Sequence, residues 1–367
     1  MRRLGHAFEE IVSKENLFLA YKEARKGKVK YRQVKRFEAH LDRNIERLRK
    51  KLIAGKWEVW GYRQFEKRDG EKIRKVDWDP CFVDNIVQHA IEQVAGRYLI
   101  KSGIEDTYAG IKKRGIHKGV ERMILFIQSF EGRPFYVLKM DAKKYYQNID
   151  HDILKQMIRL KIKDKDVLKL LDKIIDSHFP GLPIGNYLSQ LLANYYLSQY
   201  DRFVKDSGFR CYSRYCDDIV ILHEDKNKLR DLLRETEYWF TGMRLTIKKN
   251  VQIFPFERDG LDYLGYIFTY EPSGGQGEEA RGIKVYLRRT TETKYYRASS
   301  RFQKRPSEKN SRPLSSYWGW FKWLTRGDRL WHSNFDCSYK KLHAKTKKTG
   351  GKKHEQHSQG TSNVLPQ

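Results

Sequence analysis

The amino-acid sequence predicts an α+β protein built around a small antiparallel sheet in a split βαβ arrangement, with helices on one face of the sheet. Between residues 135 and 270 the pattern runs strand, helix, helix, strand, strand, helix, strand, which is typical of such sheets. A hydrophobic content of 39% with 13% aromatic residues indicates a folded chain. Its 367 residues suffice for two or three packed units.

The N-terminal third is predicted to be helical and then to form a hairpin. Apolar residues at helical spacing indicate helices over 7–27 and 33–54. Residues 57–78 alternate between apolar and polar side chains around Asp69-Gly70, which is a strong hairpin signal. Asp84 is expected to cap the helix that follows.

The centre of the chain contains the remaining predicted elements of the sheet. A Gly- and Lys-rich loop is expected at 108–119, and a flexible segment at 271–282 separates the centre from a helical unit around 315–331. Beyond about Tyr339 the chain is Lys-rich and then polar, which predicts a mobile tail. The central elements are helices at about 118–130, 152–178, 187–206 and 225–243, a strand ending at Asp141, a hairpin at 209–223, and strands at 244–248, 251–256 and 262–268.

The charge of the chain predicts a polyanionic partner. Lys and Arg number 74 against 46 Asp and Glu, a net charge of +28, and such a field attracts polyanions. Basic residues recur beside aromatic ones, as in "YLRRTTETKYYR" (286–297), which favours nucleic acid over an acidic membrane surface. No run of ~18 apolar residues predicts a membrane span, and no secretory signal is expected at the N-terminus. Four cysteines without CxxC spacing favour a reduced, cytoplasmic interior and speak against a structural zinc site.

Three carboxylates carry the candidate chemistry. In "RYCDDIVIL" (214–222), Asp217 and Asp218 precede an apolar strand. A lone Asp-Asp pair is more often an ordinary turn. Here, however, Asp141 ends the first strand of the same predicted sheet, so the three carboxylates are expected to meet. Carboxylate oxygens suit Mg²⁺, and a pair of such ions can promote in-line displacement at a phosphate.

Several segments together resemble one family. "YCDD" resembles the YxDD signature of reverse transcriptases, and "KMDAKKYYQNIDHD" resembles the first palm motif of that family. "GLPIGNYLSQLLANYYL" resembles the segment between them, "EKRDGEKIRKVDW" the fingers hairpin, and "LDYLGYIF" the turn that grips the primer. These motifs follow the family's order over about residues 57–270. The resemblance implies a right-hand polymerase with an N-terminal helical region (1–56), fingers (57–134), a catalytic palm (135–270), a small helical thumb (271–338) and a basic, polar tail (339–367).

The resemblance also implies roles for individual residues. Two Mg²⁺ ions, with Mn²⁺ as an alternative, would be held by Asp141, Asp217, Asp218 and the Ala142 carbonyl. The nucleoside triphosphate would contact Lys67, Arg74, Lys144, Tyr145, Tyr146, Ile184 and Gly185. Template and primer would contact Ser189, Gln190, Tyr215, Leu264 and Gly265.

Four of these roles have a stated physical basis. The ring of Tyr146 would crowd a ribose 2′-hydroxyl and so favour deoxynucleotides. Lys67 and Arg74 would grip the triphosphate. Gly185 would let the backbone approach the template–primer closely. Lys248 or Lys249 is a further candidate, as a proton donor to pyrophosphate.

A finer resemblance concerns fidelity. Ile184 stands where most of the family has Gln, and Gln190 where it has Pro; the form "IGxxxSQ" resembles the reverse transcriptases of diversity-generating retroelements. So do the length, "ENLFLAYKEARKGK" and "SSYWGWFKW". This implies a bacterial or phage-encoded enzyme that copies template RNA with errors at adenines, so that the cDNA diversifies a target gene. Its partners would be dNTPs, the RNA/cDNA duplex and a small basic helical accessory protein.

Two alternatives remain open at this point. The nearer one is a reverse transcriptase of the group II intron, retron or phage-defence kind. The other belongs to a different class: a non-catalytic RNA-binding module that has kept a palm fold. Three convergent carboxylates speak against the second alternative, because clustered negative charge would repel RNA phosphates.

Overall fold

The computed structural model describes residues 3–69, 72–270 and 282–324. The chain forms two compact units, residues 1–258 and 259–367. The α+β class predicted from the sequence is confirmed. The finer division into fingers, palm and thumb stays a prediction. Among the described helices, none is long and apolar enough to cross a membrane.

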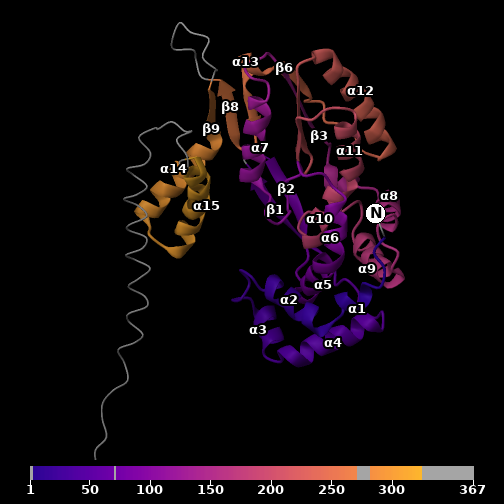
Figure 1. Cartoon of the computed structure of the whole chain (residues 1–367). Helices are drawn as coiled ribbons and strands as arrows, with labels where there is room; N and C mark the ends of the chain where they lie inside the picture. Colours follow the sequence, from indigo (N-terminus) through magenta and orange to yellow (C-terminus); the bar gives the residue numbers. More distant parts are fainter. Residues whose placement is uncertain (1–2, 70–71, 271–281, 325–367) are drawn as a thin grey trace, which may run out of the picture. The chain divides into compact units, whose positions relative to one another are not determined.

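The first unit begins with four short helices where the sequence predicted two long ones (Figure 1). Ser13 accounts for the first break, because its side chain accepts a hydrogen bond from the Asn16 backbone N–H and so caps the second helix. A cap inside an otherwise periodic stretch is easily missed by a periodicity argument. The four helices are α1 (Phe8–Ile11), α2 (Lys14–Ala24), α3 (Arg32–Glu38) and α4 (Leu41–Ile53).

The predicted hairpin follows as β1 (Arg63–Asp69) and β2 (Lys72–Trp78), with Lys67 directly opposite Arg74. Asp84 does not cap the next helix, because the N-cap position of α5 (Phe82–Ile91) is Cys81. The Asp84 carboxylate instead accepts hydrogen bonds from the Trp57 indole and from the Trp60 backbone, and so ties the segment before β1 to α5. The chain continues through a π-helical turn (Glu92–Gly96) into α6 (Arg97–Lys101), and then into α7 (Ile116–Gln128).

A four-stranded antiparallel sheet forms the centre of the first unit, with strand order β4-β5-β3-β6. Helices α8 to α12 lie between its strands in the chain, and in Figure 1 they are seen to the right of the sheet and below it. The strands are β3 (Tyr136–Asp141), β4 (Tyr212–Tyr215), β5 (Asp218–His223) and β6 (Gln252–Pro255). The other elements are the 3-10 turn Tyr145–Asn148 and the helices α8 (His151–Arg159), α9 (Lys165–Asp176), α10 (Tyr187–Tyr196), α11 (Ser198–Asp206), α12 (Lys226–Gly242) and α13 (Phe256–Asp259).

Two predicted helices are split in this region, and one predicted strand is wrong. Asp164 accepts backbone hydrogen bonds from residues 166 and 167 and begins α9 as a separate helix. Residues 187–206 form two helices that meet at Leu197. The predicted strand 244–248 is reduced to an isolated bridge between Ala142 and Ile247; Arg244, the first residue of that prediction, has a positive φ of 52°, which is not a strand conformation.

Alternation along the strands sorts the side chains of the sheet onto two faces. Residues facing each other across an antiparallel pair point to the same side. On one face, Leu138 lies opposite Ile221 and Met140 opposite Ile219, and all four belong to the main hydrophobic core. The next pair, Asp141 and Asp218, therefore lies on the opposite face, at the end of both strands.

The second unit contains a separate three-stranded antiparallel sheet and two helices. The predicted strand 262–268 is in fact two strands, β7 (Leu261–Tyr263) and β8 (Tyr266–Tyr270), joined by a tight turn, and β9 (Ile283–Leu287) completes the sheet. Helices α14 (Arg289–Lys304) and α15 (Glu308–Leu324) follow and pack on each other. The predictions for 271–281, for 325–331 and for the tail lie outside the described residues.

Candidate active site

The carboxylates expected to meet lie at one edge of the central sheet. Asp141 ends β3 and Asp218 begins β5, and the two residues face each other in antiparallel register. Asp217 is in the turn just before β5. Like charges directly opposite each other destabilise a sheet. This edge therefore favours a cation close to the carboxylates.

The turn that carries Asp217 is tight and strained. Tyr215 pairs with Asp218, so the loop of the hairpin consists of only Cys216 and Asp217. Cys216 has a φ of +61°, which matches the first central position of a II′ turn, where Gly is usual. A side chain in this conformation costs of order 1–3 kcal/mol and persists where its surroundings hold it.

Lys248 supplies positive charge at the acidic edge. Its ammonium lies 3.2 Å from Asp141 Oδ2 and 3.8 Å from Asp217 Oδ2. Those two oxygens are therefore no more than 7.0 Å apart, the sum of the two distances. The backbone keeps Lys248 here, because its N–H donates to the Asp141 carbonyl at 2.8 Å. The sequence named Lys248 only as one of two candidate proton donors.

The electrostatics of the edge fit a hard divalent cation. Burial raises the pKa of Asp217, the Lys248 ammonium lowers it, and the Asp141 carboxylate raises it. A metal ion at the same place would add to the effect of the ammonium. Among the described side chains, no three His, Cys, Asp or Glu converge as closely as a metal-bound set. An ammonium between two carboxylates nevertheless marks a position where a cation is stabilised, and carboxylate oxygens suit Mg²⁺.

Ala142 adds a backbone oxygen next to these carboxylates. The bridge between Ala142 and Ile247 is closed by hydrogen bonds to the Asp141 and Thr246 carbonyls rather than to that of Ala142. The predicted role of the Ala142 carbonyl as an additional ligand is compatible with this geometry.

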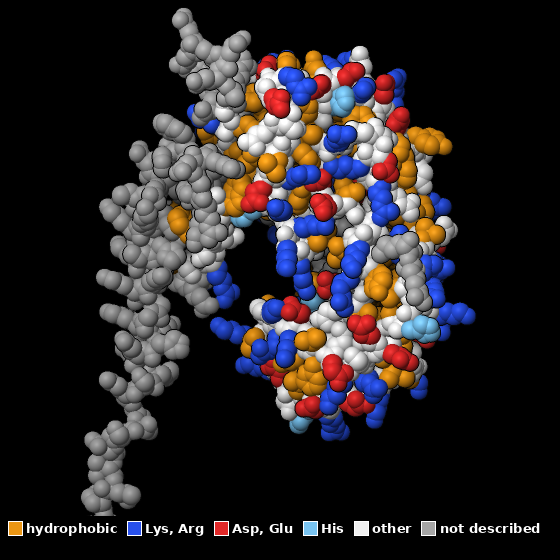
Figure 2. Space-filling view, in the orientation of Figure 1, with side chains coloured by type: hydrophobic (Ala, Val, Ile, Leu, Met, Phe, Trp, Pro, Cys, Tyr) orange, Lys and Arg blue, Asp and Glu red, His pale blue; other side chains and the backbone are white. Residues whose placement is uncertain are grey.

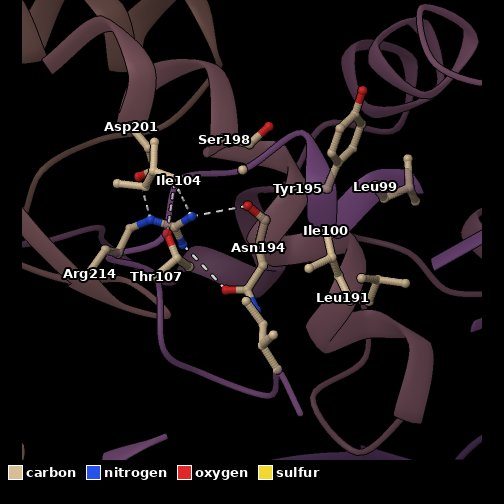
Figure 3. Close-up of a pocket in the computed structure, with 12 residues that line it drawn as sticks. Leu99, Ile100, Ile104, Thr107, Leu191, Asn194, Tyr195, Ser198, Asp201 and Arg214 are labelled. Atoms are coloured by element: carbon tan, nitrogen blue, oxygen red, sulfur yellow. Dashed lines mark hydrogen bonds and ion pairs between the residues drawn. The ribbon is translucent and has the colours of Figure 1, made fainter. Parts of the chain in front are cut away.

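A buried ion pair supports the turn from behind (Figure 3). The Arg214 guanidinium, wholly buried, donates from Nε to Asp201 Oδ1 at 2.7 Å and from Nη2 to Asp201 Oδ2 at 2.6 Å. Its Nη1 donates to the Cys216 carbonyl at 2.7 Å, and its Nη2 also donates to the Asn194 carbonyl at 3.1 Å. Burial alone would lower the pKa of Arg214, but the Asp201 carboxylate outweighs it and raises that pKa. Arg214 is thus a permanent cation that fixes the backbone immediately before Asp217.

Sequence reasoning missed this support. The signal was present in the quoted stretch, because Arg214 is a lone cation in a strand of otherwise uncharged residues. Asp201 gave a weaker signal, since an acidic residue on an amphipathic helix is ordinarily exposed. A buried cation must be paired, so the missing inference was that Arg214 requires an acidic partner from another element.

Tyr146 lies beside the turn. It belongs to the 3-10 turn after β3, and its hydroxyl oxygen is 3.7 Å from Cys216 Sγ, which donates to it. Burial raises the pKa of Tyr146, so its hydroxyl stays protonated. The neighbouring Tyr145 is directed into the core and donates to the Ala193 carbonyl at 2.5 Å. The two tyrosines thus face different surroundings, and only Tyr146 contacts the acidic turn.

The segment around Ile184 joins Tyr146 to the hairpin. The Leu182 N–H donates to the Tyr146 carbonyl at 2.8 Å, and the Gly185 N–H donates to the Asp77 carbonyl at 2.8 Å. A Cβ at Gly185 would lie 2.5 Å from that Asp77 oxygen, so the backbone of β2 alone requires glycine here. The predicted approach of Gly185 to a template stays a prediction. Ile184 is 47% exposed beside it.

The remaining predicted site residues belong to other elements of the chain. Lys67 and Lys144 are exposed, Tyr215 is half-buried next to the turn, and the side chain of Arg74 lies outside the described atoms. Ser189 is buried in α10, and Gln190 packs against Gly110. In the second unit, Leu264 and Gly265 form the β7–β8 turn, each with a positive φ.

Known proteins resemble the chain over this same region. Residues 24–268 match the family model described as reverse transcriptase (RNA-dependent DNA polymerase). The group II intron-encoded protein LtrA of Lactococcus lactis subsp. cremoris is 30% identical over 149 residues, which are 38% of this chain and 24% of that protein. Protein YkfC of Escherichia coli K12 is 22% identical over 276 residues, 62% of this chain and 72% of that protein.

A solved structure of apo telomerase from Candida tropicalis, truncated from the C-terminal domain, matches with a TM-score of 0.45 and 12% identity, over 56% of this chain and 52% of that one. The match to LtrA spans about a quarter of that protein's length. The family model, by contrast, covers most of this chain, including both strands that carry the carboxylates. The chain belongs to the reverse transcriptase (RNA-dependent DNA polymerase) family.

Proposed function

We propose that this protein is an RNA-directed DNA polymerase that copies a template RNA into cDNA by nucleotidyl transfer. The observation that carries the proposal is the register of the central sheet, which sets Asp141 opposite Asp218 and leaves Asp217 in the turn beside them. The Lys248 ammonium between two of these carboxylates supports a cation site there. Family membership supplies the reaction class.

Each group at the site has a task in this proposal. Asp141 and Asp217, with Asp218 and the Ala142 carbonyl close by, would hold two Mg²⁺ ions, which when bound lower the pKa of a 3′-hydroxyl and stabilise a leaving pyrophosphate. Lys248, whose ammonium contacts Asp141 and Asp217, would hold pyrophosphate or give it a proton. The ring of Tyr146, fixed against the turn, would limit the space beside the sugar.

Double substitution of Asp217 and Asp218 by Ala tests this proposal. The assay is dNTP incorporation on a primed RNA template with Mg²⁺, and we expect synthesis to fall to background. Glu237→Ala on the exposed face of α12 is the matched control, because it also removes an acid but leaves the sheet edge intact. Undiminished synthesis by the double variant would overturn the metal-site assignment.

We further propose that the enzyme is error-prone at template adenines, as in a diversity-generating retroelement. Ile184 presents an apolar surface, 47% exposed, where most of the family has an amide that can donate and accept hydrogen bonds. Replacing it by Gln should lower misincorporation opposite adenine while leaving total synthesis in place. If the parent makes no more such errors than Ile184→Gln, the group II intron-like alternative is favoured, with which the similarity to LtrA is compatible.

The rival from another class, a non-catalytic RNA-binding module, predicts tight RNA binding without Mg²⁺-dependent primer extension. The same extension assay on the parent chain separates the two readings. A small basic helical accessory protein and a cytoplasmic, bacterial or phage setting are part of the proposal. Co-purification of such a protein with the full chain would test the first of these.

A further inference from the structure

A groove on the N-terminal helices, away from the central sheet, has the composition of a nucleic-acid site. It has a volume of about 490 Å³ and lies between α3, α4, the segment before β1 and the start of α5. Buried Phe37, Leu48 and Trp57 contribute apolar surface to its lining. Four exposed cations, Arg36, Arg47, Lys51 and Lys56, also line it.

The charges of the groove are not balanced within it. Of its two acids, Glu58 is paired with Lys173, and Asp84 accepts hydrogen bonds from Trp57 and Trp60. Over the described part of the chain, no ion pair engages any of the four cations. Two of them, Arg47 and Lys51, are four residues apart on α4, a like-charge spacing that slightly destabilises a helix. Lys51 is favourable in the last turn of α4, but its repulsion with Arg47 is not offset within the groove, whereas an anionic ligand would offset it.

Trp60 adds a second recognition element at the same groove. Its indole is 66% exposed, although its backbone N–H is fixed to Asp84 at 2.7 Å. The Arg63 guanidinium lies 5.9 Å from the ring centroid. An exposed aromatic ring beside cations is a platform on which an unpaired base stacks while its phosphates meet the positive charges. Bases in a duplex are already stacked on each other, so this platform selects single strands.

We propose that this groove binds a single-stranded segment of nucleic acid, with phosphates on Arg47 and Lys51 and a base on Trp60. This site is distinct from the carboxylate edge of the sheet. Figure 2 has the orientation of Figure 1, in which α3 and α4 lie at the lower end of the first unit. Figure 2 shows Lys and Arg side chains over that lower end. The choice of nucleic acid as the ligand rests on the proposed function. The groove itself does not depend on catalysis.

The test measures binding of a labelled, unstructured RNA oligonucleotide to the full chain by fluorescence anisotropy, with EDTA and without nucleotides. Removal of two phosphate contacts in Arg47→Gln with Lys51→Gln should reduce the slope of log K against log salt by about 1.4, because each single-strand contact contributes about 0.7. Arg230→Gln with Arg234→Gln, also exposed and four residues apart on α12, is the matched control and should leave the slope unchanged.

Trp60 provides an independent measurement. Trp60→Ala should weaken single-strand binding about fivefold to 150-fold, the range for one stacked base, and Trp60→Phe should retain most of the affinity. Duplex RNA should be affected much less. A matching DNA oligonucleotide shows whether the strand held is RNA or cDNA.

Parental slope and affinity in folded groove variants would overturn the proposal, as would equal losses in the α12 control. A loss on duplex as large as that on single strands would also overturn it. The groove substitutions should change the slope and the affinity by the same amounts in the parent and in the Asp217→Ala with Asp218→Ala background, so a failure of the polymerase proposal would be seen separately, in the extension assay.

Discussion

Replacement of Arg214 by Met separates the stability of the site from its chemistry. The change removes a wholly buried guanidinium and leaves Asp201 buried with only hydroxyl donors, from Tyr212 at 2.5 Å and Thr107 at 3.3 Å. Breaking a buried ion pair from one side costs about 3–5 kcal/mol. Domains are stable by about 5–15 kcal/mol, so we expect a large drop in the urea midpoint and a loss of primer extension.

The double variant Arg214→Met with Asp201→Leu distinguishes the effect on stability from the effect on the turn. An apolar pair in place of a buried ion pair is often neutral or stabilising, and a cavity of about 20 Å³ adjoins the pair, lined in part by Leu99, Ile104 and Leu191 (Figure 3). Stability should therefore return. The hydrogen bond to the Cys216 carbonyl cannot return, because Met has no donor.

We thus expect a folded double variant whose extension rate stays low and whose Mg²⁺ requirement is raised. Urea unfolding and single-turnover extension across a Mg²⁺ titration measure the two effects separately. Recovery of parental rate and Mg²⁺ dependence along with stability would refute the idea that Arg214 holds the turn. A loss below about 1 kcal/mol in the single variant would refute the energetic estimate.

Three further predictions concern other parts of the first unit. Gly185→Ala would place a Cβ 2.5 Å from the Asp77 carbonyl oxygen, and should cost about 1–3 kcal/mol in urea unfolding; parental stability would contradict the close packing. Burial lowers the pKa of His89 to about 4, so between pH 6.5 and 4 the unfolded chain binds more protons than the folded chain does. The free energy of unfolding therefore falls as the pH drops through that window, by at most about 3 kcal/mol. His89→Gln should flatten this part of the melting-temperature profile, and an unchanged profile would exclude His89 as its cause. Without metal, Lys248→Met should lower the free energy of unfolding by up to about 1 kcal/mol. Addition of Mg²⁺ should then raise the melting temperature more in the variant than in the parent. Equal rises in the two proteins would show that Lys248 and the metal ion do not bind the same carboxylates.

The sequence predicted the sheet better than it predicted the helices. Residues 219–222 are a short, uninterrupted apolar run, which is typical of a buried strand, and a second, mostly apolar segment ends at Asp141. The helices were predicted too long, because caps such as Ser13 and Asp164 lie inside continuous apolar periodicity. Local hydrogen bonds decided those breaks, and periodicity does not record them.

The candidate site shows a similar division. The sequence predicted that the three carboxylates lie close together, because each stands at the end of a predicted strand of one sheet. The partnership of Arg214 with Asp201, and the position of Lys248 between two carboxylates, depend on how α11 and the segment after α12 pack. Such contacts join residues 13 or more positions apart, and no spacing rule predicts them. Gly185 illustrates the same limit, since its nearest neighbour proved to be β2.

The alternation along β3 and β5 has a consequence for how the protein matures. The residues that bury the core and the pair Asp141 and Asp218 are set by one and the same pairing. A shift of β5 by a single position would turn Asp218 toward the face that buries Met140 and Ile219 and would interchange the buried side chains of the two faces, so misaligned chains would lose core packing as well as their acidic pair. Correct assembly of the reaction centre is therefore coupled to survival of the fold, and a cell's proteases would remove defective copies before they could bind a transcript unproductively.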